Sequence, residues 1–177
     1  MRAHQLLRSE DGLSLIETAV ATGILVVVLS GLLSVLSVAA AITENEGHLS
    51  ARAAEYAQDK MEQLVALAYS DTVSDTTQIP TAPMNGTGLT VGGSADTSAP
   101  VAKYVDYLDD QGKPLCPCDG TGAPDGWFYK RAWQISLPAG TTNVKQITIT
   151  VVVARSIAKK IIPTATVTSL KARIGNE

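Results

Sequence analysis

Residues 18–42 of this 177-residue chain read TAVATGILVVVLSGLLSVLSVAAAI and include no charged side chain. A helix of about 25 residues is roughly 37 Å long, which exceeds the hydrocarbon core of a bilayer, about 30 Å thick. The leucine, isoleucine and valine side chains in this run together favour membrane insertion by on the order of 5 kcal/mol. The run therefore predicts a helix that spans a membrane once.

The charges that flank this run predict its orientation. Arg2 and Arg8 precede the run, and Glu44 and Glu46 follow it. Basic residues tend to remain on the cytoplasmic side of a membrane. We therefore expect a single-pass inner-membrane protein with a cytoplasmic N-terminus and a periplasmic remainder. The alternative is a secretory signal peptide cleaved near the alanines at 39–41, although the apolar run is about twice the usual length.

The composition argues against several classes of function. The formal net charge is −3, which disfavours a nucleic-acid partner bound through a basic face. The only histidines are His4 and His48, and the only cysteines are Cys116 and Cys118. A histidine-based catalytic triad or a four-ligand zinc site would be difficult to assemble from so few residues. We expect a protein that is not an enzyme and that binds no metal or other cofactor.

The segment 44–69 has the pattern of an amphipathic helix. Apolar residues recur at steps of three or four, while Glu55, Asp59 and Glu62 lie on other faces. A helix of this kind buries one face against another element of the fold. The residues on the expected buried stripe are Leu49, Ala53, Tyr56, Ala57, Lys60, Leu64 and Leu67.

Residues 70–126 are rich in glycine, proline, serine and threonine, and they predict a long loop. Short strands are expected near 89–91 and 103–108. The loop contains the sequence Cys116-Pro117-Cys118. A strained disulfide between these two cysteines, bridges to other subunits and free thiols are all compatible with this spacing.

The C-terminal region, 127–177, predicts antiparallel β structure. In 127–137 alternate residues are apolar, with Arg131 as the exception, and in 144–155 isoleucine and valine alternate with other residues. A third strand is expected at 164–174. Three antiparallel strands packed on the amphipathic helix would bury both apolar faces, which predicts the α+β class.

Glu17 lies just before the long apolar run. Ser14 and Glu17 have the spacing of a capping box, and an acidic residue suits the positive end of a helix. A carboxylate buried among packed apolar helices is costly unless a cation pairs with it. Helix capping and pairing with a cation are therefore both expected of Glu17, and the two can coexist.

The residues Gly12-Leu13-Ser14-Leu15-Ile16-Glu17 resemble the cleavage and methylation motif of type IV prepilins. The resemblance implies that residues 1–12 are a leader peptide and that prepilin peptidase cleaves between Gly12 and Leu13. It also implies N-methylation of Leu13, which here replaces the phenylalanine usual in the family. Glu17, fifth in the mature chain, would direct subunit assembly by pairing with the N-terminal ammonium of a neighbouring subunit.

The segment 51–64 is similar to the helix of PilV-type minor pilins and of I-type pseudopilins. The resemblance implies the pilin fold: a transmembrane and filament-core half at 13–43, an amphipathic half at 44–69, and an antiparallel sheet packed on the second half. It implies a minor pilin, a structural subunit of a type IV pilus. Its partners would be other pilin subunits, the prepilin peptidase, the inner-membrane assembly platform and the membrane. The alternatives are a type II secretion pseudopilin and a secreted or anchored binding domain with an ordinary signal peptide.

Overall fold

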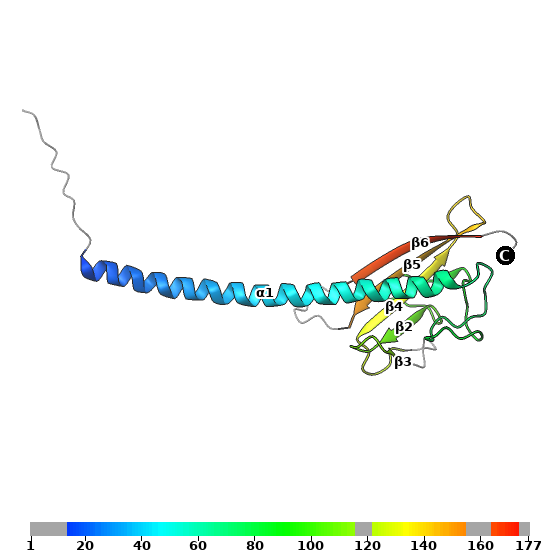
Figure 1. The fold of residues 1–177 in the computed structure, drawn as a ribbon, viewed down its shortest axis with the longest axis horizontal. Helices are drawn as coiled ribbons and strands as arrows, with labels where there is room; N and C mark the ends of the chain where they lie inside the picture. The colour runs from blue at the N-terminus through cyan, green and yellow to red at the C-terminus, as the bar shows by residue number, and fades with distance from the viewer. Residues whose placement is uncertain (1–13, 116–121, 155–163, 174–177) are drawn as a thin grey trace, which may run out of the picture. The chain divides into compact units, whose positions relative to one another are not determined.

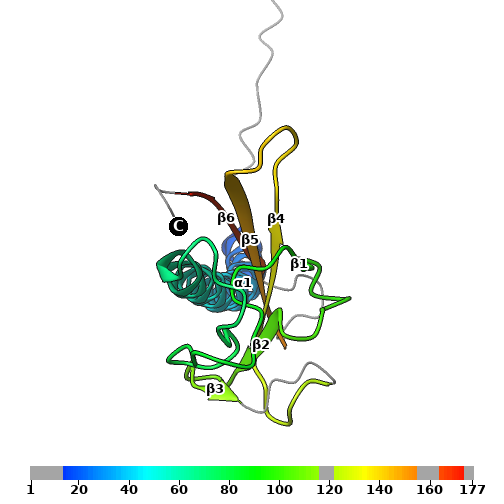
Figure 2. The same cartoon turned by 90° about the vertical axis from the view of Figure 1, so that its right-hand side faces the viewer.

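The computed structural model describes residues 14–115, 122–154 and 164–173. It has the α+β architecture expected from the sequence: a long N-terminal helix, α1 (Leu15–Ala66), packed on a small antiparallel sheet. Figure 1 shows these elements in chain order, and Figure 2 shows the later part of α1 on one side of the strands.

The chain divides into two compact units, Met1–Thr43 and Glu44–Glu177. We call the second unit the head. The helix contributes residues to both units, because it continues without a break through the position that separates them. The two helical segments expected from the sequence, 13–43 and 44–69, are therefore parts of one helix, which ends at Ala66.

Among the described residues the sheet has six strands, where the sequence predicted three in the C-terminal region and two short ones before it. The strand order is β3-β2-β4-β5-β6, β1 pairs with the same strand β4, and every pairing is antiparallel. The strands are β1 (Gly92–Gly93), β2 (Val105–Leu108), β3 (Pro114–Leu115), β4 (Tyr129–Ser136), β5 (Val144–Val153) and β6 (Thr164–Ala172).

Three of the strands, β1, β2 and β3, lie in the region expected to be mainly a long loop, 70–126, and only β3 has no counterpart among the expected strands. The expected strand at 103–108 is present as β2, whereas the one expected near 89–91 lies slightly later, as the two residues of β1. All four residues of β2 are buried, so exposure does not alternate along this strand as it does along β5. Strands as short as β1 and β3 leave no periodic pattern at all.

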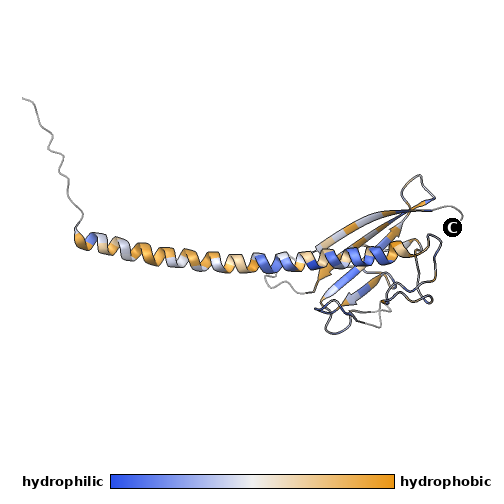
Figure 3. Cartoon of the chain, in the orientation of Figure 1, coloured by the Kyte–Doolittle hydropathy of each residue, from blue (hydrophilic) through white to orange (hydrophobic). Residues whose placement is uncertain are grey.

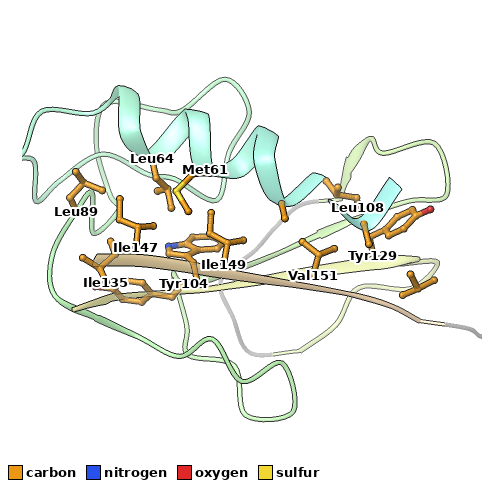
Figure 4. Close-up of a cluster of buried hydrophobic side chains, with 14 residues drawn as sticks. Met61, Leu64, Leu89, Tyr104, Leu108, Tyr129, Ile135, Ile147, Ile149 and Val151 are labelled. Atoms are coloured by element: carbon orange, nitrogen blue, oxygen red, sulfur yellow. The ribbon is translucent and has the colours of Figure 1, made fainter. Parts of the chain in front are cut away.

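The core of the head lies between α1 and the inner face of the sheet, as the alternating patterns predicted. Figure 4 shows Met61 and Leu64 of the helix directed towards Ile147 and Ile149 of β5. The cluster of buried side chains comprises Ala53, Ala57, Met61, Leu64, Leu89, Tyr104, Leu108, Tyr129, Trp133, Ile135, Ile147, Ile149, Val151 and Val153.

Two basic residues stand at positions where the periodic patterns of the helix and the sheet predict apolar side chains. Lys60 lies on the buried stripe of α1 and Arg131 on the inner face of β4, and both are fully buried. The carboxylate of Asp106, on β2, accepts hydrogen bonds from both: 2.7 Å from Lys60 Nζ, and 2.7 and 2.8 Å from Arg131 Nε and Nη2. Arg131 Nη1 also donates to Asp59 Oδ2 at 3.1 Å. We call these four residues the charged clamp.

The clamp joins the helix, the sheet and the loop in one network without net charge. Lys60 Nζ also donates to the carbonyl of Thr76 in the loop after α1, and it lies 4.3 Å from the ring centroid of Trp133. Burial alone would raise the pKa of Asp106, but Arg131 and Lys60 hold that pKa below its ordinary value. Burial lowers the pKa of Lys60, and Asp106 opposes that shift.

The end of α1 is held by lysines from the sheet. The last turn of α1 contains no basic residue of its own. Lys171 Nζ on β6 donates to the carbonyl of Val65 at 2.7 Å, and Lys145 Nζ on β5 donates to the carbonyls of Tyr69 and Leu89, each at 2.7 Å. These cations satisfy carbonyls at and beyond the negative end of the helix, where cations are stabilising.

The clamp predicts that Asp106→Asn destabilises the head strongly. The substitution leaves the charges of Lys60 and Arg131 buried without their carboxylate, and breaking a buried pair in this way costs about 3–5 kcal/mol. We expect this loss in the free energy of unfolding of the full chain in detergent, measured by chemical denaturation with tryptophan fluorescence.

The matched control is Asp59→Asn. The side chain of Asp59 is 53 % exposed, so its bond to Arg131 is worth less than about 1 kcal/mol. Equal losses for the two variants, or an Asp106→Asn variant as stable as the parent, would contradict the role given to Asp106.

Candidate membrane and assembly segment

The first part of α1 is apolar on every side and exposed along its whole length in the single chain. The exposed fraction is 87 % for Leu15, 72 % for Val27 and 66 % for Leu33. Figure 3 shows the same contrast by hydropathy: the helix is mostly orange before the head and largely blue within it. Among the described residues, α1 is the one helix long and apolar enough to cross a membrane, a test that an N-terminal signal sequence also passes.

Several hydroxyl side chains in this segment are satisfied within the helix itself. Thr18 donates to the carbonyl of Leu15 at 2.9 Å and Thr22 to that of Thr18 at 2.7 Å. Ser30 donates to the carbonyl of Val26 at 2.7 Å, and Ser34 to that of Ser30 at 2.9 Å. A polar group with an internal partner costs much less to transfer into lipid or into a packed apolar core. These serines and threonines are therefore compatible with an apolar environment.

Ser14 caps the start of α1, as the sequence spacing predicted. The Glu17 backbone N–H lies 3.3 Å from Ser14 Oγ and 3.0 Å from the Ser14 carbonyl oxygen, and the Thr18 N–H lies 3.1 Å from that carbonyl oxygen. The helix thus begins at Leu15, with Glu17 in its first turn. A carboxylate at this end of a helix is favoured by the helix dipole.

Glu17 is the single charged residue between positions 14 and 43. Its side chain is exposed in the isolated chain, where water can solvate the carboxylate. If apolar helices surround this position, the carboxylate requires a cation, because an unpaired buried charge costs several kcal/mol. The arrangement therefore suits a contact in which another molecule supplies a positive group close to the start of α1.

The structure places only some of the residues that the sequence singled out. Ser14 and Glu17 come together at the start of α1. The expected cleavage and methylation positions, Gly12 and Leu13, and the pair Cys116 and Cys118 lie outside the described residues. Within the ranges 14–115, 122–154 and 164–173, no group of three or more His, Cys, Asp or Glu side chains is close enough to hold a metal ion.

Two buried residues of the head, Asp106 and Lys145, belong to no motif in the sequence. Both act over long separations: Asp106 binds Lys60 from 46 positions away, and Lys145 binds the Tyr69 carbonyl from 76 positions away. One sign of these buried ion pairs was visible in the sequence: Lys60 and Arg131 are basic residues at positions where the pattern predicts an apolar one. A buried cation requires an acidic partner, but the sequence does not say which one.

Comparison with protein-family models, with curated proteins and with solved structures finds no significant match to this chain. The features of the described residues that bear on function are the apolar part of α1, the cap at Ser14 and the carboxylate of Glu17, the single charged group of that part.

The exposed apolar segment predicts that Leu32→Arg reduces membrane insertion. An arginine near the middle of a membrane helix costs about 2.5–3.5 kcal/mol, so the inserted fraction should fall roughly 100-fold relative to the non-inserted one. The measurement is the amount of chain that remains in membranes after alkaline extraction. The control Gln58→Arg places the same charge on an exposed helical position of the head. A Leu32→Arg chain that stays in membranes as the control does would argue against a spanning segment.

Proposed function

We propose that this chain is a minor pilin, a structural subunit of a type IV pilus. In this proposal it inserts once into the inner membrane with its N-terminus in the cytoplasm and its head in the periplasm. Prepilin peptidase removes residues 1–12, Leu13 becomes N-methylated, and an assembly platform in the inner membrane adds the subunit to a filament of other pilins through α1.

The observation that carries this proposal is where α1 begins. The helix starts at Leu15, capped by Ser14, immediately after the expected cut between Gly12 and Leu13. Cleavage there would remove Arg2, Arg8, Glu10 and Asp11 together and leave an apolar helix with almost no polar segment before it. Such an end can enter a packed core of helices, whereas four leader charges would each have to be desolvated.

The position of Glu17 supports the same proposal. Cleavage creates an ammonium on Leu13, and Glu17 is the only carboxylate in the apolar part of the helix. Between neighbouring subunits these two groups neutralise one another in surroundings where either charge alone would be unfavourable. Four hydroxyl groups in the same part of α1 donate to carbonyls of their own helix, so they need no hydrogen-bond partner from a neighbouring subunit. They belong to Thr18, Thr22, Ser30 and Ser34.

The continuity of α1 supports a filament subunit over an exported domain. A signal peptide cut near 39–41 would sever the helix that supplies Ala53, Ala57 and Leu64 to the head, a few turns before those residues. The backbone is helical through the three alanines, and the Ala39 carbonyl accepts a hydrogen bond from Thr43 at 3.0 Å. A type II secretion pseudopilin remains the alternative assignment, because it would use the same leader, the same helix and the same carboxylate.

The first test concerns leader removal. We expect Gly12→Val to remain at full length, because a bulky side chain at the expected cut would block the peptidase, while Glu10→Gln is processed normally. Intact-protein mass spectrometry of chains from cells with and without the peptidase distinguishes the two. A mature chain that starts at Leu13, with the mass of one added methyl group, would support the proposal. Normal maturation of Gly12→Val, or a chain that starts near Ala40, would exclude it.

The second test concerns Glu17. In a filament, Glu17→Ala leaves the ammonium of a neighbour without a partner, a loss of about 3 kcal/mol or roughly 100-fold in incorporation. The matched control is Glu62→Ala, which removes an exposed carboxylate from the head portion of the same helix. The measurement is the amount of each variant in sheared and purified filaments. Incorporation of Glu17→Ala at the level of the control would leave Glu17 with a capping role alone.

A further inference from the structure

Two oxygen atoms of Ser14 determine where α1 begins. The Ser14 carbonyl oxygen accepts from the N–H groups of Glu17 and Thr18, at 3.0 and 3.1 Å. Ser14 Oγ lies 3.3 Å from the same Glu17 N–H. The first N–H groups of a helix have no partner within the helix, and a serine hydroxyl at the N-cap position satisfies one of them. Ser14 is therefore the N-cap residue, and Leu15 is the first residue of the helix.

The sequence before Ser14 contains other residues at which a helix could begin. Asp11 and Gly12 both belong to the residue types favoured at an N-cap, and aspartate ranks with serine there. Residues 1–13 contain no proline, which would oppose a longer helix. A helix capped by either residue would include Leu13 in its first turn. The cap at Ser14 thus competes with starts two or three residues earlier in the chain.

The competing starts differ in their effect on the expected cut. In the observed start, only Leu13 and Ser14 separate the expected cut from the first helical residue. With a cap at Asp11 or Gly12, the bond to be cut would belong to the first turn of the helix. Helical backbone has to open locally before a protease can cut it, and the rate then follows the population of the open form. A start at Leu15 avoids this cost.

The carboxylate of Glu17 favours the same start. Glu17 is the third residue of α1 and so lies in the first turn, where the helix dipole stabilises a negative charge. With a cap at Asp11 it would be the sixth helical residue, beyond the first turn, where this stabilisation falls off. The hydroxyl of Ser14 and the carboxylate of Glu17 therefore act together on the position at which α1 begins.

We propose that Ser14 is a positioning residue for leader removal: by holding the start of α1 at Leu15, its hydroxyl keeps the bond after Gly12 accessible to the peptidase. This inference rests on the proposed function, because it concerns the same cut. In the reaction water adds across the peptide bond, so that Gly12 gains a carboxylate and Leu13 an ammonium. Ser14 forms and breaks no bond in this step, and acts only through the position of the helix start.

The first experiment compares initial rates of cleavage of the full-length precursor by prepilin peptidase in detergent. We expect Ser14→Ala to be cleaved about two- to fivefold more slowly than the parent, because alanine cannot cap the helix. Ser14→Asn should be cleaved at the parent rate, because asparagine caps a helix as well as serine does. A peptidase that simply recognises a small side chain at position 14 would give the opposite order. The matched control, Ser30→Ala, removes a hydroxyl that is bonded within the helix and should leave the rate unchanged.

The outcomes separate this inference from the proposed function. An unchanged rate for Ser14→Ala, or equal slowing of the alanine and asparagine variants, would overturn the role of Ser14 while cleavage after Gly12 stands. A parent chain that is not cut after Gly12 would remove the proposed function, and this inference with it.

The second experiment locates the helix start without the peptidase. Amide hydrogen exchange is measured residue by residue for the parent precursor and for Ser14→Ala in detergent. In the parent, Thr18 has the first N–H of α1 that bonds to the carbonyl four positions earlier. An earlier start would give the Ile16 N–H such a partner at Gly12, so we expect this amide to exchange about two- to fivefold more slowly in Ser14→Ala. Identical exchange of Ile16 in the two chains would show that the helix start does not depend on Ser14, which contradicts the inference.

Discussion

The carboxylate of Asp106 is the group on which the head depends. It binds Lys60 from the helix and Arg131 from the sheet, and none of these three side chains is accessible to water. Neither cation could occupy its apolar surroundings without that carboxylate, since an unpaired buried charge costs several kcal/mol. A slip of α1 by one turn would separate Lys60 from Asp106 and leave both buried charges without their partners. The clamp thus specifies which turn of the helix meets which strand, a selectivity that apolar contacts alone would not provide.

Hydrogen bonds from buried lysines to backbone carbonyls fix the segment that follows α1. Lys60 binds the carbonyl of Thr76, and Lys145 binds those of Tyr69 and Leu89. The long connection between the helix and the first strand is therefore held at several points by side chains of the core. This explains how a stretch rich in glycine, serine and threonine can have an ordered path with little regular secondary structure.

The sequence predicted those parts of the fold that follow a period. The stripe on α1 and the alternation of Ile147, Ile149 and Val151 on β5 are confirmed, because each reflects one element facing one core. The strand expected at 103–108 is confirmed as β2, whereas the two-residue strand β3 and the role of Asp106 were not predictable, since so short a strand shows no period and a long-range ion pair has no local signal. The cap at Ser14 is confirmed, while cleavage after Gly12 and the pairing of Glu17 remain predictions.

The distribution of apolar side chains around α1 changes near Glu44, where the two parts of the helix meet. Beyond Glu44 its apolar residues lie on one stripe, and the sheet of the same chain covers that stripe. Before that residue the apolar side chains point in all directions, and a helix of that kind is stable only when it is covered on all sides. Among the described residues the sheet of the head covers only the later part of α1, so the apolar part has no cover within the described chain. That part is long and apolar enough to cross a membrane, and lipid would supply the cover that its side chains lack.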